Sequence, residues 1–283
     1  MGLVVALLRV TDPRPTVDPL SGAVRSDDRS ATLSDQDAAA LEQALRAGEV
    51  LGCPVLAIAA GGVEVEPALR SALALGCVVL RVPLPMGVST DVFVDEQALA
   101  AALVAGMGEH TPTLVVCGDR SADRGTGALP AFVAAVLGVS QALGLVALAV
   151  TKTSVRAERR LDGGRREMLE IALPAVVSVE AAGMRLRRAP LSAAVAATAA
   201  AVPVAASVIS GSPVEVRRVR AFTPRTRELA PPQPGPPRVR LLELTGALTA
   251  HEPPTIVGPV QASEAADVLL EFLRRHGYLE PSS

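Results

Sequence analysis

Short apolar runs alternate with longer segments of helical spacing over the first 150 residues. The runs have the length of strands and are rich in Val, Leu and Ile; they cover residues 3–10, 55–59, 78–82, 114–117 and 145–150. Between them, apolar residues recur on one helix face in residues 35–47, 64–76, 96–106 and 126–137. Strands that are buried on both faces are typical of parallel sheets. The pattern therefore predicts an α/β fold, a parallel sheet with helices on both faces.

The pattern changes after residue 151. Residues 155–173 have the sequence VRAERRLDGGRREMLEIAL, in which charge-rich strands flank Asp162, Gly163 and Gly164. This composition predicts a β-hairpin with a partly solvated face. One more strand is expected in PAVVSVE, and an alanine-rich stretch follows it.

The C-terminal part is predicted to be an extended arm. PPQPGPP, residues 231–237, is too rich in proline to pack regularly and indicates a linker. Residues 263–276 have helical spacing, with Ser263 as the expected cap and basic residues near the end. We therefore divide the chain into an α/β domain with its hairpin, residues 1–230, and a linker with a terminal helix, residues 231–283.

Composition excludes several classes of function. The formal net charge is -2, which gives no electrostatic basis for binding nucleic acid. Four Phe, one Tyr and no Trp do not provide a platform on which bases could stack. Cys53, Cys77 and Cys117 lie far apart, as do the histidines, so no metal site is expected. We expect buried, inert thiols, which suit a reducing cytoplasm.

Two uncharged stretches have the length of a membrane span. Residues 128–150 contain Pro130, Gly138 and Gly144 and divide naturally into a helix and a strand. Residues 189–213 are mostly alanine and are interrupted by Pro203. A spanning helix needs about 20 strongly apolar residues. We expect neither stretch to insert into a membrane, and the N-terminus lacks the features of a signal peptide.

The stretch VVCGDRSADRGTGALP, residues 115–130, joins a predicted strand to a predicted helix. In open α/β sheets, ligands bind beyond the carboxyl ends of the strands. Gly118, Gly125 and Gly127 keep Cβ atoms away from a ligand, and Thr126 can cap the helix or bond an anion. The free amides of a helix start favour a phosphate. The pattern indicates a phosphate-binding loop.

Charged residues of this loop have candidate roles as well. Arg120 or Arg124 would add positive charge, and Asp123 would bond a sugar hydroxyl or orient the loop. The alternative is an ordinary glycine-rich turn, because neither a Walker A sequence nor G-x-G-x-x-G is present. No G-x-S-x-G occurs and His is rare, so a nucleophilic triad is not expected. Arg187 and Arg188 indicate a solvated or partner-facing pair.

Several motifs follow one another at characteristic spacing. They are VVALLRVTDP at the first strand, SDQDAAALEQALR, GGVEVEPALRSALALGC, the loop quoted above, VLGVSQ, and the late strand LPAVVSVE. In order and spacing, these motifs resemble those of the β-subunit of electron transfer flavoproteins. The resemblance covers nearly the whole chain.

The resemblance implies a Rossmann-like sheet of the adenine nucleotide α-hydrolase type and a heterodimer with an α-subunit. In that family the α-subunit holds most of a redox FAD, and the β-subunit closes over it and binds AMP. A second FAD in place of AMP is left open. The pair carries electrons from a flavin dehydrogenase to a quinone reductase or a similar acceptor, and is not itself a catalyst. Here no side chain is an obvious electron store, which agrees with redox chemistry on a cofactor.

The resemblance also implies positions for the functional residues. Those that correspond to nucleotide-contacting positions of the family are Ala6, Ser34, Asp35, Gln36, Asp37, Ala60, Gly118, Ser121, Asp123, Gly125, Thr126 and Gly127. Leu191 corresponds to the leucine that anchors partner dehydrogenases. Residues 185–191 would form the docking loop, in which Arg187 and Arg188 supply positive charge.

Departures from the family pattern indicate a divergent bacterial paralogue. Ser34, Asp35 and Gln36 replace N-P-F, and Asp119 stands where Lys or Arg is usual. Such divergent forms include some associated with the redox peptide mycofactocin. Two alternatives stay open from sequence. One is a stand-alone adenine-nucleotide-binding regulator of the universal-stress kind, and the other is a subunit that only assembles.

Overall fold

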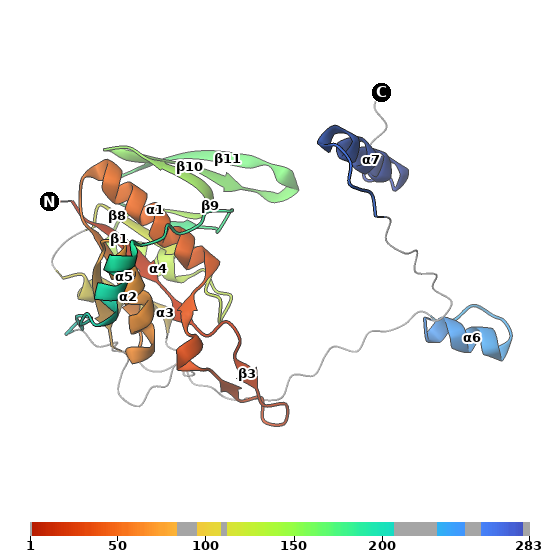
Figure 1. Ribbon diagram of the computed structural model, residues 1–283, viewed down its shortest axis with the longest axis horizontal. Helices are drawn as coiled ribbons and strands as arrows, with labels where there is room; N and C mark the ends of the chain where they lie inside the picture. Colours follow the sequence, from red (N-terminus) through yellow and green to blue (C-terminus); the bar gives the residue numbers. More distant parts are fainter. Residues whose placement is uncertain (1, 84–94, 109–111, 207–230, 247–255, 280–283) are drawn as a thin grey trace. The chain divides into compact units, whose positions relative to one another are not determined.

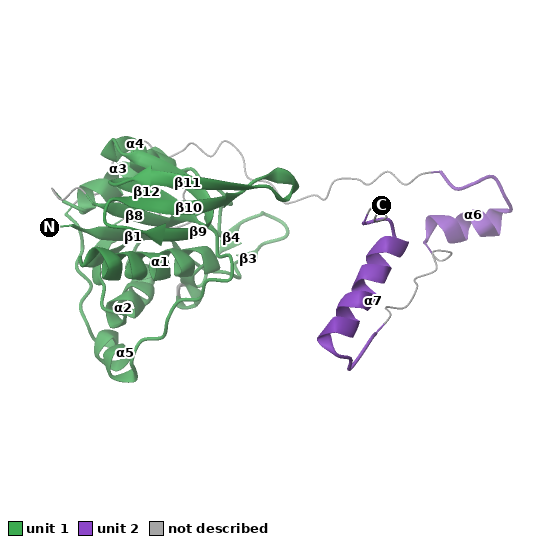
Figure 2. Cartoon of the chain, turned by 90° about the horizontal axis from the view of Figure 1, so that it is seen from above, with its two compact units in different colours: residues 1–222 green, residues 223–283 purple. Residues whose placement is uncertain are grey.

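The computed structural model describes residues 2–83, 95–108, 112–206, 231–246 and 256–279. The chain forms two compact units, Met1–Phe222 and Thr223–Ser283, which Figure 2 distinguishes by colour. Within the described residues, the first unit contains an eight-stranded sheet. Its strands are β1 (Val4–Leu8), β6 (Val55–Ala60), β7 (Val78–Val82), β8 (Leu114–Gly118), β9 (Ser140–Val150), β10 (Ser154–Arg160), β11 (Arg166–Ala172) and β12 (Ala175–Val179).

The strand order is β11-β10-β9-β12-β8-β1-β6-β7. The pairs of β1 with β6 and β8, of β6 with β7, and of β12 with β8 and β9 are parallel. Only the hairpin side, β9 with β10 and β10 with β11, is antiparallel within the described sheet. The predicted α/β, Rossmann-like fold is confirmed.

Successive residues of β1 face opposite helical layers, as the pleat of a strand requires. Val4 and Ala6 pack with α1 (Asp35–Leu51) and α2 (Glu66–Ala74). Val5 and Leu7 pack with α3 (Glu96–Gly106) and α4 (Leu129–Leu137). Figure 2 shows α1 and α2 on one face of the sheet and α3 and α4 on the other. A strand covered on both sides must be apolar throughout, which explains the continuous runs in the sequence.

The hairpin of β10 and β11 turns where the sequence predicts. A short 3-10 helix, Asp162–Gly164, connects the strands, and Gly163 and Gly164 have φ of 70° and 74°. Glycine adopts this left-handed region without the Cβ clash that other residues meet. Met168 on β11 is 72% exposed, so the hairpin has the solvated face that was predicted. The hairpin is visible in green at the top of Figure 1.

Several element boundaries differ from the prediction. α2 begins at Glu66, after a 3-10 helix at Val63–Val65, and not at residue 64. β9 begins at Ser140, five residues before the predicted start. Gly144 lies inside this strand, although its backbone is left-handed. It lies at an irregularity in the pairing of β9 with β12, where a strand tolerates such a residue. The uncharged stretch 128–150 is thus divided between α4 and β9, as predicted.

Two small antiparallel sheets lie between β1 and α1 along the chain. β2 (Val10–Thr11) pairs with β5 (Thr32–Leu33), and β3 (Thr16–Val17) pairs with β4 (Val24–Arg25). A 3-10 helix covers Asp28–Ser30. The apolar pattern did not predict these two-residue strands, because they are too short to show an alternation.

The second unit contains α6 (Pro237–Leu244) and α7 (Ala262–Arg275), and neither has a buried residue. α6 was not predicted; it starts at the last proline of the supposed linker, where the missing amide hydrogen costs nothing. The predicted cap of α7 is wrong, because Ser263 lies inside the helix and Gln261 is the residue at the cap. No helix among the described residues is long and apolar enough to cross a membrane.

Candidate functional site

The start of α1 meets the carboxyl end of β1. Ser34 is the N-cap of α1: its Oγ accepts a hydrogen bond from the Asp37 amide at 3.0 Å, and its hydroxyl donates to one carboxylate oxygen of Asp37. The other carboxylate oxygen of Asp37 accepts the Arg9 amide at 3.0 Å. Asp37 therefore fixes the chain that leaves β1 against the helix start. Sequence reasoning had placed Ser34 and Asp37 at the nucleotide, and had not recognised this joint.

The Asp37 carboxyl group is only 4% exposed. Burial raises its pKa to about 6, although hydrogen bonds from Ser34 and the Arg9 amide act in the opposite direction. The neighbouring Asp35 is exposed and Gln36 is partly buried. The amide of Asp37 at the start of α1 is thus already bonded to its own cap.

Gly118 ends β8 directly against this helix start. A Cβ at Gly118 would lie 3.2 Å from the Gln36 Cβ and 3.3 Å from the Asp37 amide, so the glycine allows a close approach. Ala6 lies in the middle of β1 and is fully buried in the α1 layer of the core. Ala60 is partly buried at the end of β6. The structure brings Ser34, Asp37 and Gly118 together and places Ala6 inside the sheet.

The loop after β8 closes on itself between Ser121 and Thr126. The Ser121 amide donates to the Thr126 carbonyl at 2.8 Å, and the Gly125 amide donates to the Ser121 carbonyl at 2.9 Å. The Ser121 Oγ accepts the Thr126 amide at 3.2 Å, and Ser121 is buried. Gly125 has φ of 66°, and a Cβ at Gly127 would lie 2.5 Å from the Asp119 carbonyl oxygen. Ser121 and both glycines therefore determine the shape of this loop.

The predicted capping role of Thr126 is wrong. α4 starts at Leu129, its cap position is Ala128, and no side chain caps it. Pro130 lies in the first turn and sets this start, since proline at that place needs no partner for an amide hydrogen. The Thr126 hydroxyl instead donates to Glu96 at the start of α3. Glu96 gave no signal in the sequence beyond its position in a helix start.

Two arginines surround Asp123. The Arg9 Nη2 lies 2.6 Å from the Asp123 carboxylate, and the Arg124 Nε lies 3.8 Å from it. Of the two predicted roles of Asp123, orienting the loop is the one that this geometry supports. Burial lowers the pKa of Arg124, yet a guanidinium remains charged in proteins. Arg9 was not predicted as a site residue. A charged residue at the carboxyl end of a buried central strand could have indicated one.

The start of α4 has no side-chain cap. The first amides of a helix have no partner within it and carry partial positive charge, and α4 has no side-chain cap to occupy them. Gly125 and Gly127 precede this start without side chains, and Arg9 and Arg124 lie close to the same loop. Within the described residues, the buried Asp119 Oδ1 has no hydrogen-bond partner. A ligand that carries both a phosphate and a hydrogen-bond donor would satisfy these groups.

Comparison with known proteins decides the family. The family model of the electron transfer flavoprotein domain matches residues 23–207, which is more than half of the chain. The chain belongs to the electron transfer flavoprotein domain family. It is 28% identical over 143 residues to the electron transfer flavoprotein subunit beta of Syntrophomonas wolfei subsp. wolfei (strain DSM 2245B / Goettingen). That match covers 48% of this chain and 56% of the relative, so the chain spans about half the length of the curated relative.

The resemblance that the motifs indicated is thereby confirmed, and the electron transfer flavoprotein domain includes the segment predicted to dock partners. Leu191 is the first residue of α5 (Leu191–Thr198) and is 81% exposed. Val195, one turn later, is 62% exposed. Arg188 is also exposed. Residues 185–190 lie outside helices and strands, as expected for a loop, whereas Leu191 already belongs to α5. α5 presents Leu191 and Val195 to solvent.

Arg187 is bound within its own chain. Its Nε and Nη2 donate to the two carboxylate oxygens of Glu42 at 3.0 Å each, and another nitrogen donates to Glu49. Burial raises the pKa of Glu42, but hydrogen bonds from Arg187 and Arg46 outweigh this and lower it to about 2. The charge of Arg187 is therefore compensated by two glutamates of α1. Arg187 and Arg188 are both exposed, so their interpretation as a solvated or partner-facing pair stays a prediction.

The cysteines of this electron transfer flavoprotein domain are structural. Cys77 and Cys117 are buried, Cys53 is partly buried, and no disulfide joins them. Burial raises the pKa of each thiol, which disfavours the reactive thiolate. Among the described residues, no group of three His, Cys, Asp or Glu side chains could hold a metal ion.

Proposed function

We propose that this chain is the β-type subunit of an electron transfer flavoprotein. In this proposal it assembles with an α-subunit that holds most of the FAD, and the pair carries electrons in the cytoplasm. A flavin dehydrogenase is the donor and a quinone reductase or similar protein is the acceptor. The family match and the similarity to a β-subunit support the proposal. The chain's own part is to bind a nucleotide, to close over the flavin and to present a surface to partners.

The observation that carries the nucleotide-binding part is the uncapped start of α4 beside the loop of Gly125 and Gly127. We infer that the phosphate of AMP binds there, because helix-start amides and nearby guanidinium groups stabilise an anion. Arg9 and Arg124 would balance its charge while Asp123 holds them in place. The same groups would accept the AMP half of a second FAD.

The adenosine part would lie toward Asp119 and the start of α1. Asp119 Oδ1 is buried without a partner among the described residues, so a ribose hydroxyl or the adenine amine would satisfy it. Burial raises the pKa of Asp119, which reduces the repulsion between this carboxyl group and a phosphate. Gln36, partly buried beside Gly118, offers an amide to the same ligand.

Replacement of Ala128 tests the phosphate site. Ala128→Asp places a carboxylate among the first amides of α4, which stabilises the helix but repels a phosphate. Ala128→Asn is the matched control, because it has the same shape without the charge. The AMP released from the denatured complex should fall about tenfold in Ala128→Asp relative to Ala128→Asn, the result of roughly 1.4 kcal/mol. Equal AMP in the two variants would contradict this site.

A further inference from the structure

α5 is a short helix with little support of its own. Only Ala197 is buried among its residues, and no side chain caps its start. Leu191 and Val195, four residues apart and therefore on one face, are both exposed. An isolated helix of this length is not stable in water. α5 packs against α2, and the segments on either side of it also bear on its position.

The segment before α5 is attached to α1 through Arg187. The Arg187 amide donates to Glu42 Oε2 at 3.1 Å, in addition to the two guanidinium bonds to the same carboxylate. Glu42 is 2% exposed, and Arg46 is its other partner, at 2.8 Å. A planar guanidinium that meets a carboxylate with two bonds fixes direction as well as distance. This bidentate contact defines the entry to α5.

The segment after α5 is attached to α2 and to the edge of the sheet. The Arg70 Nε donates to the Ala200 carbonyl at 3.0 Å, and its Nη2 bonds Glu66 at 2.9 Å. Farther on, the Arg81 amide donates to the Pro203 carbonyl at 2.9 Å, and the Ala205 amide donates to the Arg81 carbonyl at 2.8 Å. The exit from α5 is thus held by hydrogen bonds to α2 and to the edge of the sheet.

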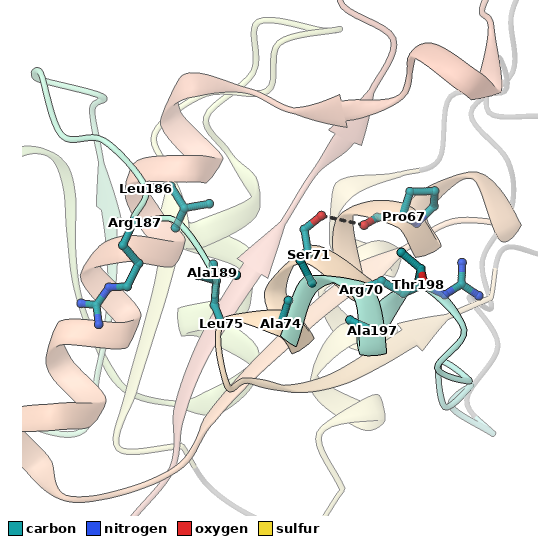
Figure 3. A pocket seen from close by; sticks show the side chains of 11 residues that line it. Pro67, Arg70, Ser71, Ala74, Leu75, Leu186, Arg187, Ala189, Ala197 and Thr198 are labelled. Carbon is teal, nitrogen blue, oxygen red and sulfur yellow. Dashed lines mark hydrogen bonds between the residues drawn. The ribbon is translucent and has the colours of Figure 1, made fainter. Parts of the chain in front are cut away.

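Between these attachments α5 packs against α2, and a groove of about 450 Å³ is lined by residues of both helices. Its walls are mostly alanine and other apolar residues, and both Arg70 and Arg187 line it, as Figure 3 shows. Only Ala197 of α5 is buried, so packing against α2 leaves most of the surface of α5 unsupported. The polar attachments at the two ends therefore carry much of the orientation of α5.

We propose that Arg187 and Arg70 are positioning residues that hold α5 with Leu191 and Val195 facing outward. They act through α5 and do not themselves contact a partner. The docking consequence rests on the proposed function: the apolar face is preorganised for an apolar pocket on the electron donor. Loss of either attachment lowers the fraction of molecules in which α5 is held with this face outward. The apparent affinity for the electron donor falls in proportion to that fraction.

Amide hydrogen exchange of the full-length chain tests the positioning. Arg187→Gln should raise exchange in residues 191–200 about tenfold, while β8 and β12 exchange as before. Arg46→Gln is the matched control, because it also removes a partner of Glu42 but the ion pair that it breaks lies within α1. Arg70→Gln should reproduce the effect from the other end of α5. Exchange in residues 191–200 that is the same in Arg187→Gln, Arg70→Gln and Arg46→Gln would overturn the proposal.

Electron transfer adds a readout that a purely structural role would not give. The test uses a dehydrogenase that reduces the flavin of the wild-type complex. Arg187→Gln should raise the concentration of the complex that half-saturates this dehydrogenase about tenfold, and should leave the maximal rate of flavin reduction unchanged. Arg187→Lys should restore part of the affinity, since it keeps the charge but not the bidentate geometry. A lower maximal rate at unchanged half-saturation would overturn the proposal. If no dehydrogenase reduces the wild type, the proposed function fails, and the exchange comparison still decides the role of Arg187.

Discussion

At the scale of single residues, Asp37 and Arg9 connect segments that are far apart in the sequence. The Arg9 amide binds the Asp37 carboxylate, and the Arg9 guanidinium binds Asp123 on the loop after β8. The end of β1, the start of α1 and the glycine loop are thereby joined through two side chains. A buried carboxylate with this role is costly when it is ionised, because burial disfavours charge.

This cost predicts a pH dependence of stability. Burial raises the pKa of Asp37 from 3.8 to about 6, so between these values the folded chain keeps a proton that the unfolded chain has lost. Stability due to Asp37 is then complete below about pH 4 and falls as pH rises to 6, by up to roughly 3 kcal/mol. Asp37→Asn should remove this fall.

The measurement is urea unfolding followed by circular dichroism between pH 4 and pH 7, since the chain has no Trp. The free energy of unfolding of Asp37→Asn should rise relative to that of wild type as pH increases. Asp35→Asn, an exposed carboxylate on the same turn, is the control and should stay parallel to wild type. A constant difference between Asp37→Asn and wild type across this range would show that Asp37 titrates normally.

At the scale of elements, the central strands and the starts of α1 and α3 could be predicted from sequence, whereas the starts of α2 and α4 could not. A continuous apolar run indicates a strand that is buried on both faces, and such runs predicted β1, β6, β7 and β8. Thr126 and Ser263 were chosen as caps from the preferences of their residue types. In the structure Pro130 sets the start of α4, and Ser263 lies inside α7.

The features of the candidate site that could not be predicted from the sequence are mostly pairs of side chains. Arg9 and Asp123 are separated by 114 residues, and Arg187 and Glu42 by 145. Apolar periodicity carries no information about such pairs, because it specifies only which face of an element is buried. The glycines of the loop could be recognised in the sequence. A positive φ or a close backbone approach favours glycine, so glycine marks such positions.

The exposed face of α5 leads to a prediction about partner choice. An anchor leucine that enters an apolar pocket contributes about 2 kcal/mol, or some thirtyfold in affinity. Leu191→Ala should therefore weaken docking of the donor dehydrogenase by that factor without a change in flavin content or melting temperature. Leu20, 91% exposed elsewhere in the first unit, is the matched control. Equal rates of flavin reduction in Leu191→Ala and Leu20→Ala would exclude Leu191 as the anchor.

At the scale of the whole molecule, the two described helices of the second unit have no buried residue. Val268, Leu269 and Phe272 of α7 are between 38% and 57% exposed. An amphipathic helix buries such a face against a partner when one is present. We propose that the partner is the α-subunit of the complex.

Removal of residues 231–283 tests this proposal. The truncated chain should keep the circular dichroism of the first unit, because no described residue of α6 or α7 is buried. Its association with the α-subunit should weaken in size-exclusion chromatography at micromolar concentration. The double variant Leu269→Ala, Phe272→Ala keeps residues 231–283 and should also weaken association with the α-subunit. Association of the truncated chain at full strength would place the arm outside the interface.

The measurement that bears most directly on the central claim is the cofactor content of the chain purified together with an α-type subunit. We expect a yellow complex of one chain of each kind, with one FAD in the pair and one AMP, or a second FAD, at the edge formed by α4 and the glycine loop. We also expect a flavin dehydrogenase to bleach the complex. A colourless homodimer that contains ATP, or a 1:1 complex without flavin and nucleotide, would contradict the electron-carrier function.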